Sequence, residues 1–469
     1  MLGLPGAPGY YVKTTIFMNS NSENNNTDKI KPRAAIHALG CRLNQAEAAT
    51  LQSSLEQAGY QMVPWGEEAE VCVLNSCTVT GQSDAKSRQA LGAIRRQYPQ
   101  AKLAVVGCYA QMAGDTLAQK DLADLIIGSQ EKMNLVQHLQ APQADNAAPQ
   151  VIRPPIRREA FSQQAWAAQD AATRPHLKVQ DGCDFMCSFC VIPFARGRSR
   201  PRLLADTLAE AGHLATQGAK ELVLTGVNVG TWAENGQNLL AMVDALNDLP
   251  GLARIRIGSI EPTTVPPGLL ERMAAADHKL VPFLHLPLQS GSNTVLSAMR
   301  RRYTAQQYRA EVMSAVSQVP DVCVGADVLT GFPGEDDALH QETLDFLAEL
   351  PLAYFHVFPY SPRQGTPAAR MGDQVPAPVK RQRVQQLMAL SDSKRLAYQA
   401  GFVGRVLPVL FERAAPGSPA QGYTANYLRV GLSPEAPAPE PNSLHPVRMT
   451  ATGLPLMQGQ ALPGGFSSQ

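Results

Sequence analysis

Hydrophobic and polar positions alternate with two different periods along the chain, and the change of period predicts its elements. Between residues 34 and 140, short apolar runs are each followed by a segment with apolar positions at helical spacing. The predicted strands are Ala34–Ala38, Val71–Leu74 and Leu103–Val106, and a helix is predicted around Lys86–Arg96. Asn44, with Glu47 three residues later, predicts a capping box at the start of the first helix. Strands that alternate with helices indicate an α/β domain with a parallel sheet over residues 34–140.

From residue 174 the alternation starts again and continues to about residue 400. Helix-like segments, among them Leu203–Ala215 and Ala305–Ser317, separate the strand-like segments. Six of these segments follow one another: His176–Val179, Glu221–Leu224, Arg254–Ile260, Phe283–Leu288, Val322–Leu329 and Tyr354–Phe358. Six βα units in series predict a partial (β/α)6 barrel over residues 174–400. Residues 376–400 are predicted to form a basic amphipathic helix, in which Lys380, Arg381 and Arg383 are interpreted as a solvated face.

Three segments lack this alternation. Residues 1–33 are polar and are predicted to be a disordered leader, in which Met18 is an alternative start. Residues 141–173, rich in Ala, Gln and Pro, are interpreted as a linker. From Phe402, short β-like runs broken by Pro and Gly predict a small antiparallel β-barrel over residues 401–464, with PEAPAPEP as a loop inside it.

The composition excludes several classes of protein. No run of 18 apolar residues occurs among the 469, so a membrane-spanning helix is not expected. The beginning of the chain has no apolar segment typical of a signal peptide, and we expect a cytoplasmic protein without a membrane partner. Lys plus Arg is 41 and Asp plus Glu is 40, so contact with nucleic acid would have to use local patches. Eight cysteines are too few for a disulfide scaffold of this length, which favours metal binding or chemistry.

Three of the cysteines follow one another closely in the segment CDFMCSFC. Cys183, Cys187 and Cys190 have C-x3-C-x2-C spacing directly after the first strand of the second alternating region. Three thiolates on one loop can hold three irons of a 4Fe-4S cluster and leave the fourth iron open to another ligand. The alternative is a structural zinc knuckle, which would need a second pair of ligands that does not follow.

Three further cysteines each follow the end of a predicted strand. Cys41, Cys77 and Cys108 are about one βα unit apart, and ligands of open parallel sheets bind at the edge where the strands end. The three thiolates can therefore converge, although unrelated buried cysteines are the alternative. Cys72 and Cys323 lie inside strands and are predicted to be core residues.

The two sets of cysteines stand in longer motifs. In the first domain these motifs are ALGCRLNQAE, LNSCTVTGQSDAKSRQ and VVGCYAQ. In the second they are KVQDGCDFMCSFCVIPFARGRSRPR, ELVLTGVNVG, RIGSIEP, HLPLQSGSNTVLSAMRRRYT, GFPGE and FHVFPYSPRQGTPAA. Together they resemble the methylthiotransferase branch of the radical S-adenosylmethionine enzymes. The resemblance extends from about residue 34 to residue 464, and the terminal β-barrel looks like a TRAM domain.

The resemblance implies two 4Fe-4S clusters and S-adenosylmethionine as cofactors. Cys183, Cys187 and Cys190 would be the catalytic set, whose cluster binds S-adenosylmethionine and cleaves it to a 5′-deoxyadenosyl radical. Cys41, Cys77 and Cys108 would bind an auxiliary cluster that takes up the sulfur to be methylated. The cofactor-binding positions that match the family are Phe189, Gly226, Ser259, Glu261 and Gln289, with loop capping as the alternative for the last three. An electron donor of the flavodoxin or ferredoxin type and a sulfur source are implied as partners.

The expected substrate is tRNA. Arg196, Arg198, Arg200 and Arg202 directly follow the cluster loop, and Arg300–Arg302 is a second basic run, so both are candidates for phosphate contact. Tyr423, Tyr427 and Arg429 of the terminal barrel are candidates for RNA stacking, although Tyr423 can equally be a core residue.

The motifs CTVT and ARGRSRPR look like the subgroup that acts on N6-threonylcarbamoyladenosine at position 37, whose carboxylate suits an arginine. Within the family, isopentenyladenosine at position 37 and an aspartate of a ribosomal protein are the alternative substrates. An electron-transfer iron–sulfur protein and a zinc-stabilised RNA-binding module are the alternatives outside it.

Overall fold

The computed structural model describes residues 31–142, 148–163, 165–166, 173–414 and 418–463. Its contacts divide the chain into two compact parts. The N-terminal part comprises the described residues up to 77, residues 82–155 and residues 165–166, and the C-terminal part comprises residues 78–81, 156–163 and 173–463. Met18 and nearly all of the predicted leader lie outside the described residues. Among those described, no helix is long and apolar enough to cross a membrane.

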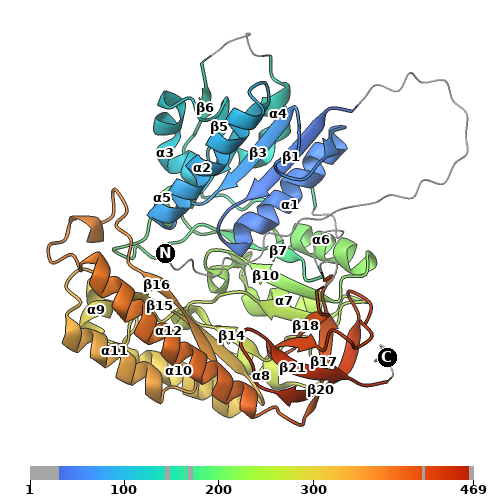
Figure 1. The fold of residues 1–469 in the computed structure, drawn as a ribbon, viewed down its shortest axis with the longest axis vertical. Coiled ribbons are helices and arrows are strands. Elements are labelled where there is room, and N and C mark those ends of the chain that lie inside the picture. The colour runs from blue at the N-terminus through green and yellow to red at the C-terminus, as the bar shows by residue number, and fades with distance from the viewer. Residues whose placement is uncertain (1–30, 143–147, 164, 167–172, 415–417, 464–469) are drawn as a thin grey trace, which may run out of the picture. The chain divides into compact units, whose positions relative to one another are not determined.

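The N-terminal part is a parallel sheet with helices on both faces, in agreement with the predicted fold class (Figure 1). Its strands stand in the order β2-β1-β3-β4-β5-β6, and all neighbouring strands are parallel. The strands are β1 Arg33–Ala38, β2 Gln61–Met62, β3 Val71–Ser76, β4 Lys102–Gly107, β5 Leu125–Ile127 and β6 Gln150–Ile152. The helices are α1 Arg42–Gln57, α2 Gly81–Gln97, α3 Cys108–Gln119, the 3-10 turn η1 Lys132–Asn134 and α4 Leu135–Gln140.

The central strand β3 shows why the sheet is covered twice. All six of its residues are buried, and successive side chains face opposite sides. Cys72 packs in the cluster that contains Leu91 of α2, whereas Val73 packs in the cluster that contains Leu51 of α1. Cys72 is therefore a core residue, as predicted.

Two predictions for this part are wrong. The first helix begins at Arg42 after Cys41, so Asn44 is not its N-cap. Asn44 is buried, and its side-chain amide donates hydrogen bonds to the carbonyl oxygens of Leu39 at 2.8 Å and Ser76 at 3.0 Å. Glu47 is not a capping residue either, because its buried carboxylate pairs with Lys132 at 2.6 Å. The predicted linker also contains a strand, since residues 150–152 form β6 on the edge of the sheet.

The C-terminal part contains six parallel strands in chain order, as two three-stranded sheets, β7-β10-β13 and β14-β15-β16. A bridge between Ile255 and Leu280 links the two sheets. The strands are β7 His176–Lys178, β10 Glu221–Thr225, β13 Arg254–Ile257, β14 Phe283–His285, β15 Cys323–Thr330 and β16 Tyr354–Pro359. This arrangement agrees with the predicted partial (β/α)6 barrel, and the barrel is open.

Helices cover one face of these strands (Figure 1). They are α6 Leu204–Thr216, α7 Leu239–Asn247, α8 Leu269–Ala274, α9 Asn293–Ala298, α10 Ala305–Gln318, α11 Asp337–Glu349 and α12 Ala377–Ala400. The short elements between them are β8 Gln180–Asp181, α5 Ile192–Arg196, β9 Arg200–Pro201, η3 Val229–Thr231, β11 Ala233–Glu234, β12 Gln237–Asn238, η4 Pro262–Thr264 and η5 Ala368–Arg370. Alternate residues of the strands, such as Leu284, Val324 and Phe355, pack beneath the helices in one large core. The side chains between them, among them His285, Asp327 and His356, therefore face the inside of the open barrel.

The interpretation of the basic run on α12 as a solvated face is wrong for two of its three residues. Arg383 is buried and pairs with Glu335 at 2.8 Å, so it does not belong to a solvated face. Lys380 is partly buried and donates a hydrogen bond to the carbonyl oxygen of Tyr360 at 3.1 Å. Of the three, only Arg381 is exposed.

The chain ends in a closed five-stranded barrel, β17-β18-β19-β21-β20. The strands are β17 Val406–Phe411, β18 Gln421–Thr424, β19 Arg429–Leu432, β20 Leu444–Ala451 and β21 Met457–Ala461. The barrel is mixed and not purely antiparallel, because β19 and β21 are parallel. The PEAPAPEP segment lies between β19 and β20.

Two tyrosines of this terminal barrel pack against residues of the (β/α)6 barrel, whose strands β7, β10, β13, β14, β15 and β16 are called the central strands below. The ring of Tyr427 lies 4.5 Å from that of Phe283 and 5.1 Å from that of Tyr423. The guanidinium of Arg174 lies 3.9 Å from the centre of the Tyr423 ring. Tyr423 and Tyr427 are therefore partly buried against strands of the (β/α)6 barrel, and each keeps a partly exposed side chain.

Candidate functional site

The loop between β8 and α5 carries Cys183, Cys187 and Cys190, and each sulfur accepts one N–H hydrogen bond. The backbone amide of Phe185 donates to Cys183 at 3.3 Å, and that of Ile192 donates to Cys190 at 3.4 Å. The third sulfur, of Cys187, accepts from the side chain of Arg301 at 3.2 Å. Donors of this kind stabilise thiolates that are bound to iron.

The position of the loop depends on glycine. Gly182 has φ +71°, and a Cβ atom there would lie 2.0 Å from the carbonyl oxygen of Arg198. The amide of Cys183 donates to the carbonyl oxygen of Gly197 at 3.1 Å, which joins the two ends of the loop. Glycine at position 182 thus allows the segment that carries Arg198 to lie against the start of the loop.

Burial raises the pKa of all three thiols. For Cys183 the pKa rises to about 11 and for Cys190 to about 12, in both cases because burial disfavours the thiolate. A cysteine nucleophile needs the opposite shift, so burial does not activate these thiols as free nucleophiles. Within the described residues, these three sulfurs do not form a group close enough to bind one metal ion together. The group that does is His285, Asp327 and His356. Thiolates of a cluster bind different irons and lie farther apart, so the donor set fits an iron–sulfur cluster and not a mononuclear zinc site.

Cys41, Cys77 and Cys108 all lie where strands of the N-terminal sheet end. Cys77 directly follows β3 and Cys108 directly follows β4, while Cys41 precedes α1. A Cβ atom on Gly40 would lie 2.6 Å from the sulfur of Cys77, so the segment before Cys41 contacts Cys77 closely. Cys41 is exposed, whereas Cys77 and Cys108 are buried.

Buried polar side chains hold these strand ends together. The side-chain amide of Asn75 donates to the carbonyl oxygen of Asn44 at 2.8 Å. The side-chain amide of Asn44 donates in turn to the carbonyl oxygen of Ser76. The hydroxyl of Ser76 donates to the carbonyl oxygen of Val106 at 2.6 Å and accepts from the amide of Ala110 at 3.3 Å. This network orders the surroundings of the three cysteines, which suits a second cluster.

Four of the predicted cofactor residues follow strands of the C-terminal part, and the fifth, Phe189, lies in the cysteine loop. Gly226 directly follows β10 and is held tightly against Gln180, whose side-chain oxygen would lie 2.9 Å from a Cβ at position 226. Ser259 is exposed just after β13. Phe189 is partly buried against the cluster that contains Phe332, so its ring has a core contact as well as a free part.

Glu261 and Gln289 have unusual surroundings. The carboxylate of Glu261 pairs with Arg301, and burial, which is only partly offset by that pairing, raises its pKa. Gln289 has φ +74°, a strained conformation for a residue other than glycine. Its backbone amide donates a hydrogen bond to the carbonyl oxygen of Asp327 at 2.8 Å. Strain of this kind is concentrated at functional sites, which makes Gln289 a strong candidate.

The structure corrects the expectation for three of the four arginines after the cluster loop. Arg196 and Arg200 are buried and pair with Asp181 at 3.0 and 3.3 Å. Arg202 is fully buried and pairs with Asp206 at 2.6 Å and with Glu210. These guanidinium groups stabilise the interior, so only Arg198, which is partly exposed, remains a candidate for substrate contact.

Arg301, within the basic run Arg300–Arg302, is a candidate site residue that the sequence did not single out. It joins Cys187, Glu261 and Tyr303, whose hydroxyl accepts from its Nε atom at 3.1 Å. Arg302 also contacts the cluster loop, because it donates to the carbonyl oxygen of Asp184 at 3.0 Å and stacks on Phe185. Both arginines contact the cysteine loop and hold it in position. In the sequence, arginines with this role look the same as arginines that contact phosphate.

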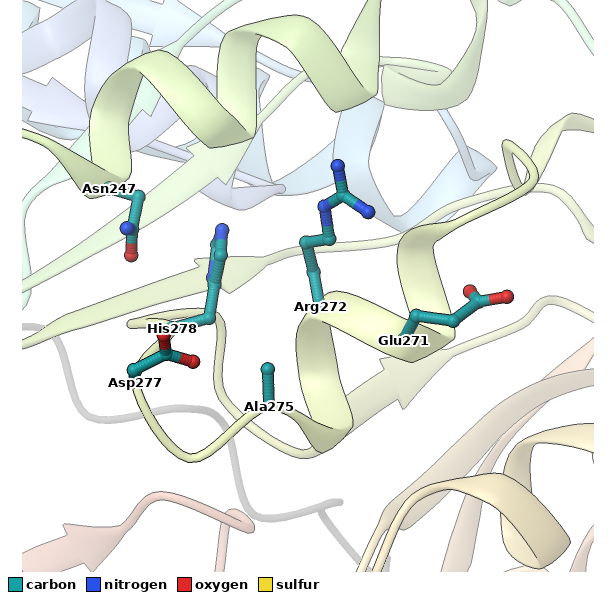
Figure 2. A pocket seen from close by; sticks show the side chains of 6 residues that line it. All are labelled: Asn247, Glu271, Arg272, Ala275, Asp277 and His278. Atoms are coloured by element: carbon teal, nitrogen blue, oxygen red, sulfur yellow. The ribbon is translucent and has the colours of Figure 1, made fainter.

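Figure 2 shows a surface pocket of about 280 Å³ that contains none of the predicted site residues. It is lined by Asn247, Glu271, Arg272, Ala275, Asp277 and His278. These residues come from the end of α7, from α8 and from the loop before β14, so they precede strands β13 and β14. The cysteine loop and the cofactor candidates follow strands instead, and the pocket is not part of their site.

Comparisons with known proteins agree with this geometry. Residues 33–128 match the model of "Uncharacterized protein family UPF0004", and residues 177–347 match that of the radical SAM superfamily. A threonylcarbamoyladenosine tRNA methylthiotransferase of Bacillus subtilis (strain 168) is 36% identical over 405 residues, which cover 84% of this chain and 89% of that protein. A tRNA-2-methylthio-N(6)-dimethylallyladenosine synthase of Cereibacter sphaeroides (strain ATCC 17025 / ATH 2.4.3) is 32% identical, covering 91% of this chain and 98% of that protein.

Among solved structures, the radical S-adenosylmethionine methyltransferase TsrM of Kitasatospora setae matches with a TM-score of 0.53. The two chains are 16% identical over 72% of this chain and 77% of that one. This likeness shows a shared fold.

Proposed function

Because this chain belongs to the radical S-adenosylmethionine tRNA methylthiotransferases, we propose that it methylthiolates C2 of N6-threonylcarbamoyladenosine at position 37 of tRNA. The product would be 2-methylthio-N6-threonylcarbamoyladenosine. The choice of this base rests on the relatives named for it and on a partly exposed arginine beside the cluster loop.

The observation that carries the proposed chemistry is the loop of Cys183, Cys187 and Cys190 with an N–H donor at each sulfur. These cysteines would hold a 4Fe-4S cluster, which supplies the reductive cleavage of S-adenosylmethionine when bound. Arg301 orients the loop through Cys187 and holds Glu261 beside it. The S-adenosylmethionine would be bound by Phe189 of the cysteine loop and by four residues that follow strands: Gly226, Ser259, Glu261 and Gln289.

Cys41, Cys77 and Cys108 would hold the second, auxiliary cluster. Support comes from their common position at strand ends and from the polar network of Asn44, Asn75 and Ser76 around them. The exposed Cys41 leaves one side of the site accessible, which suits a cluster that must receive sulfur. The implied partners are tRNA, a sulfur source and an electron donor of the flavodoxin or ferredoxin type.

Arg198 is proposed to recognise the threonyl carboxylate. Arginine and a carboxylate can form two parallel hydrogen bonds, and a site built for that pair rejects a neutral isopentenyl group, because the arginine would be left desolvated and unpaired. The burial of Arg196, Arg200 and Arg202 in ion pairs leaves Arg198 as the arginine of this segment with surface to offer.

The test uses the cluster-loaded enzyme with two tRNAs, one bearing N6-threonylcarbamoyladenosine and one bearing isopentenyladenosine. After digestion, mass spectrometry should find the 2-methylthio product from the first tRNA alone. Arg198→Ala should lower that turnover about 100-fold, since the lost pair is charge-assisted. Arg381→Ala, which removes an exposed arginine on α12, is the matched control and should leave turnover unchanged.

Other products would favour the other branches. A 2-methylthio-isopentenyladenosine product would refute the proposed base and retain the class of enzyme. A modified aspartate in a ribosomal protein, with no tRNA product, would refute tRNA as the substrate.

A further inference from the structure

His285, Asp327 and His356 come together on three neighbouring strands. The strands β14, β15 and β16 are adjacent, with His285 paired to Gly325 and Asp327 paired to His356 in the register. The Oδ1 atom of Asp327 lies 3.2 Å from Nε2 of His285 and 3.2 Å from Nδ1 of His356. All three possible ligand atoms lie within 4.8 Å of one another.

The group faces the inside of the open barrel, opposite the helix-covered core. Val324, Ala326 and Val328 of β15 pack beneath the helices, so Asp327 between them faces the other way. Exposure of the side chains increases across the group, from 6% for His285 through 24% for Asp327 to 50% for His356. The group is therefore anchored on one side and open to solvent on the other.

Tyr354 gives His285 the second contact that a ligating histidine needs. Its hydroxyl lies 3.2 Å from Nδ1 of His285, and the other ring nitrogen of His285 is directed at Asp327. Metal-binding histidines generally use one nitrogen for the ion and donate the N–H of the other to an oxygen, which fixes the tautomer and the ring. Tyr354 can accept that N–H, which leaves Nε2 free of a proton and available to an ion.

We propose that His285, Asp327 and His356 form a binding site for a divalent transition metal ion such as Zn²⁺ or Fe²⁺. Ions bound at about 2.0–2.1 Å place tetrahedral ligands roughly 3.3 Å apart, close to the two separations that Asp327 makes. Two imidazoles and one carboxylate are a donor set that these ions accept, with the remaining positions left for water or an oxygen ligand. The three residues include none of the six candidate cluster cysteines, and the proposal does not depend on the proposed function.

A group that only exchanges hydrogen bonds is the competing explanation, and metal retention separates the two. The cluster-loaded full chain is mixed anaerobically with a small excess of Zn²⁺, passed through a desalting column and analysed for zinc and iron. The wild type should retain one more zinc per chain than His356→Gln, while iron stays equal. Because His356 is half exposed, its replacement should leave the fold intact.

His278→Gln is the matched control, because His278 also lies beside a carboxylate, Asp244, at 3.4 Å, yet belongs to no group of three ligands within the part of the chain that the structure describes. It should retain zinc like the wild type. Asp327→Asn keeps the size of the side chain and should lose zinc. Zinc should also raise the melting temperature of the wild type and of His278→Gln, but not of the other two variants.

X-ray absorption at the zinc edge identifies the ligands. The proposal requires nitrogen and oxygen at about 2.0–2.1 Å with imidazole scattering, and no sulfur at about 2.3 Å. Sulfur ligation, equal zinc in the wild type and His356→Gln, or no zinc retained by the wild type would each overturn it.

Discussion

Single glycines decide where the cysteine-bearing loops can lie. Gly182 and Gly107 both have positive φ next to a candidate cluster ligand, and Gly40 precedes another with φ +101°. A side chain at any of these positions would contact nearby atoms at 2.6 Å or less. The identity of these residues is therefore as important for the sites as that of the cysteines.

Gly182→Ala should halve the iron content of the reconstituted protein, from about eight to about four per chain if both clusters form. The new Cβ would lie 2.0 Å from the carbonyl oxygen of Arg198, so the loop must move. Iron is measured colorimetrically after anaerobic reconstitution. Gly236→Ala is the control, because Gly236 also has positive φ but no atom within 4 Å, and it should keep its full iron content. Full iron in Gly182→Ala would show that the loop tolerates the displacement.

At the scale of elements, buried ion pairs connect the cluster loop to the strands and helices around it. Arg202 ties the start of α6 to β7, because it pairs with Asp206 and Glu210 and donates to the carbonyl oxygen of Lys178 at 3.2 Å. Its own carbonyl oxygen accepts from the buried Trp232 at 2.8 Å. The ARGRSRPR segment is thus mostly a structural connection, with Arg198 as the exception.

Arg202→Ala should lower the free energy of unfolding by about 3–5 kcal/mol, because it removes a fully buried guanidinium that pairs with the carboxylates of Asp206 and Glu210. Chemical denaturation followed by circular dichroism measures the change. Arg198→Ala, in the same segment, should change stability by no more than about 0.5 kcal/mol. If Arg202→Ala were as stable as the wild type and bound tRNA more weakly, the original expectation of a substrate role would be right.

At the scale of the whole C-terminal part, one buried carboxylate organises the contact between the central strands and the terminal barrel. Glu221 pairs with Arg256 at 2.6 Å, and Arg256 also donates to the carbonyl oxygen of Ala425 in the terminal barrel at 2.9 Å. Arg254 donates to the carbonyl oxygens of Pro408 and Tyr423 at 2.8 and 3.0 Å. The terminal barrel therefore satisfies buried guanidinium groups of the central strands, and we expect the two to unfold together.

This junction should lose stability in acid. Burial opposes the ionisation of Glu221, but Arg256, Arg174 and Arg254 outweigh it and lower the pKa of Glu221 from 4.5 to about 2. A carboxylate whose pKa is lower in the folded state stabilises the fold above the unfolded pKa, and the contribution is lost as pH falls from 4.5 towards 2. The full contribution is on the order of 3 kcal/mol.

Glu221→Gln should therefore be less stable than the wild type at pH 7 and should lose less stability between pH 5 and pH 3. Urea denaturation across this range, monitored by tryptophan fluorescence, gives both values. Parallel pH dependence in the two proteins would show that other carboxylates cause the acid sensitivity.

The sequence by itself determined the class of fold and the class of enzyme. Hydrophobic period depends on residues a few positions apart, so the parallel sheet, the six βα units and the β-rich end could all be predicted locally. The spacing of Cys183, Cys187 and Cys190 is local as well, and the long motifs around the cysteines are specific enough to indicate a methylthiotransferase, which the comparisons confirm.

Only the tertiary structure decided which charged and polar residues are buried. The four arginines after the cluster loop look alike in sequence. Three of them are buried and pair with carboxylates inside the fold, whereas Arg198 is partly exposed. Asn44 matched the pattern of a helix N-cap. In the fold it lies between two strand ends, where its side-chain amide donates to the carbonyl oxygens of Leu39 and Ser76. His285, Asp327 and His356 are far apart in the chain and meet through the register of β14, β15 and β16, which no local pattern contains. Burial and strand register depend on distant residues, and for that reason a period or a spacing cannot reveal them.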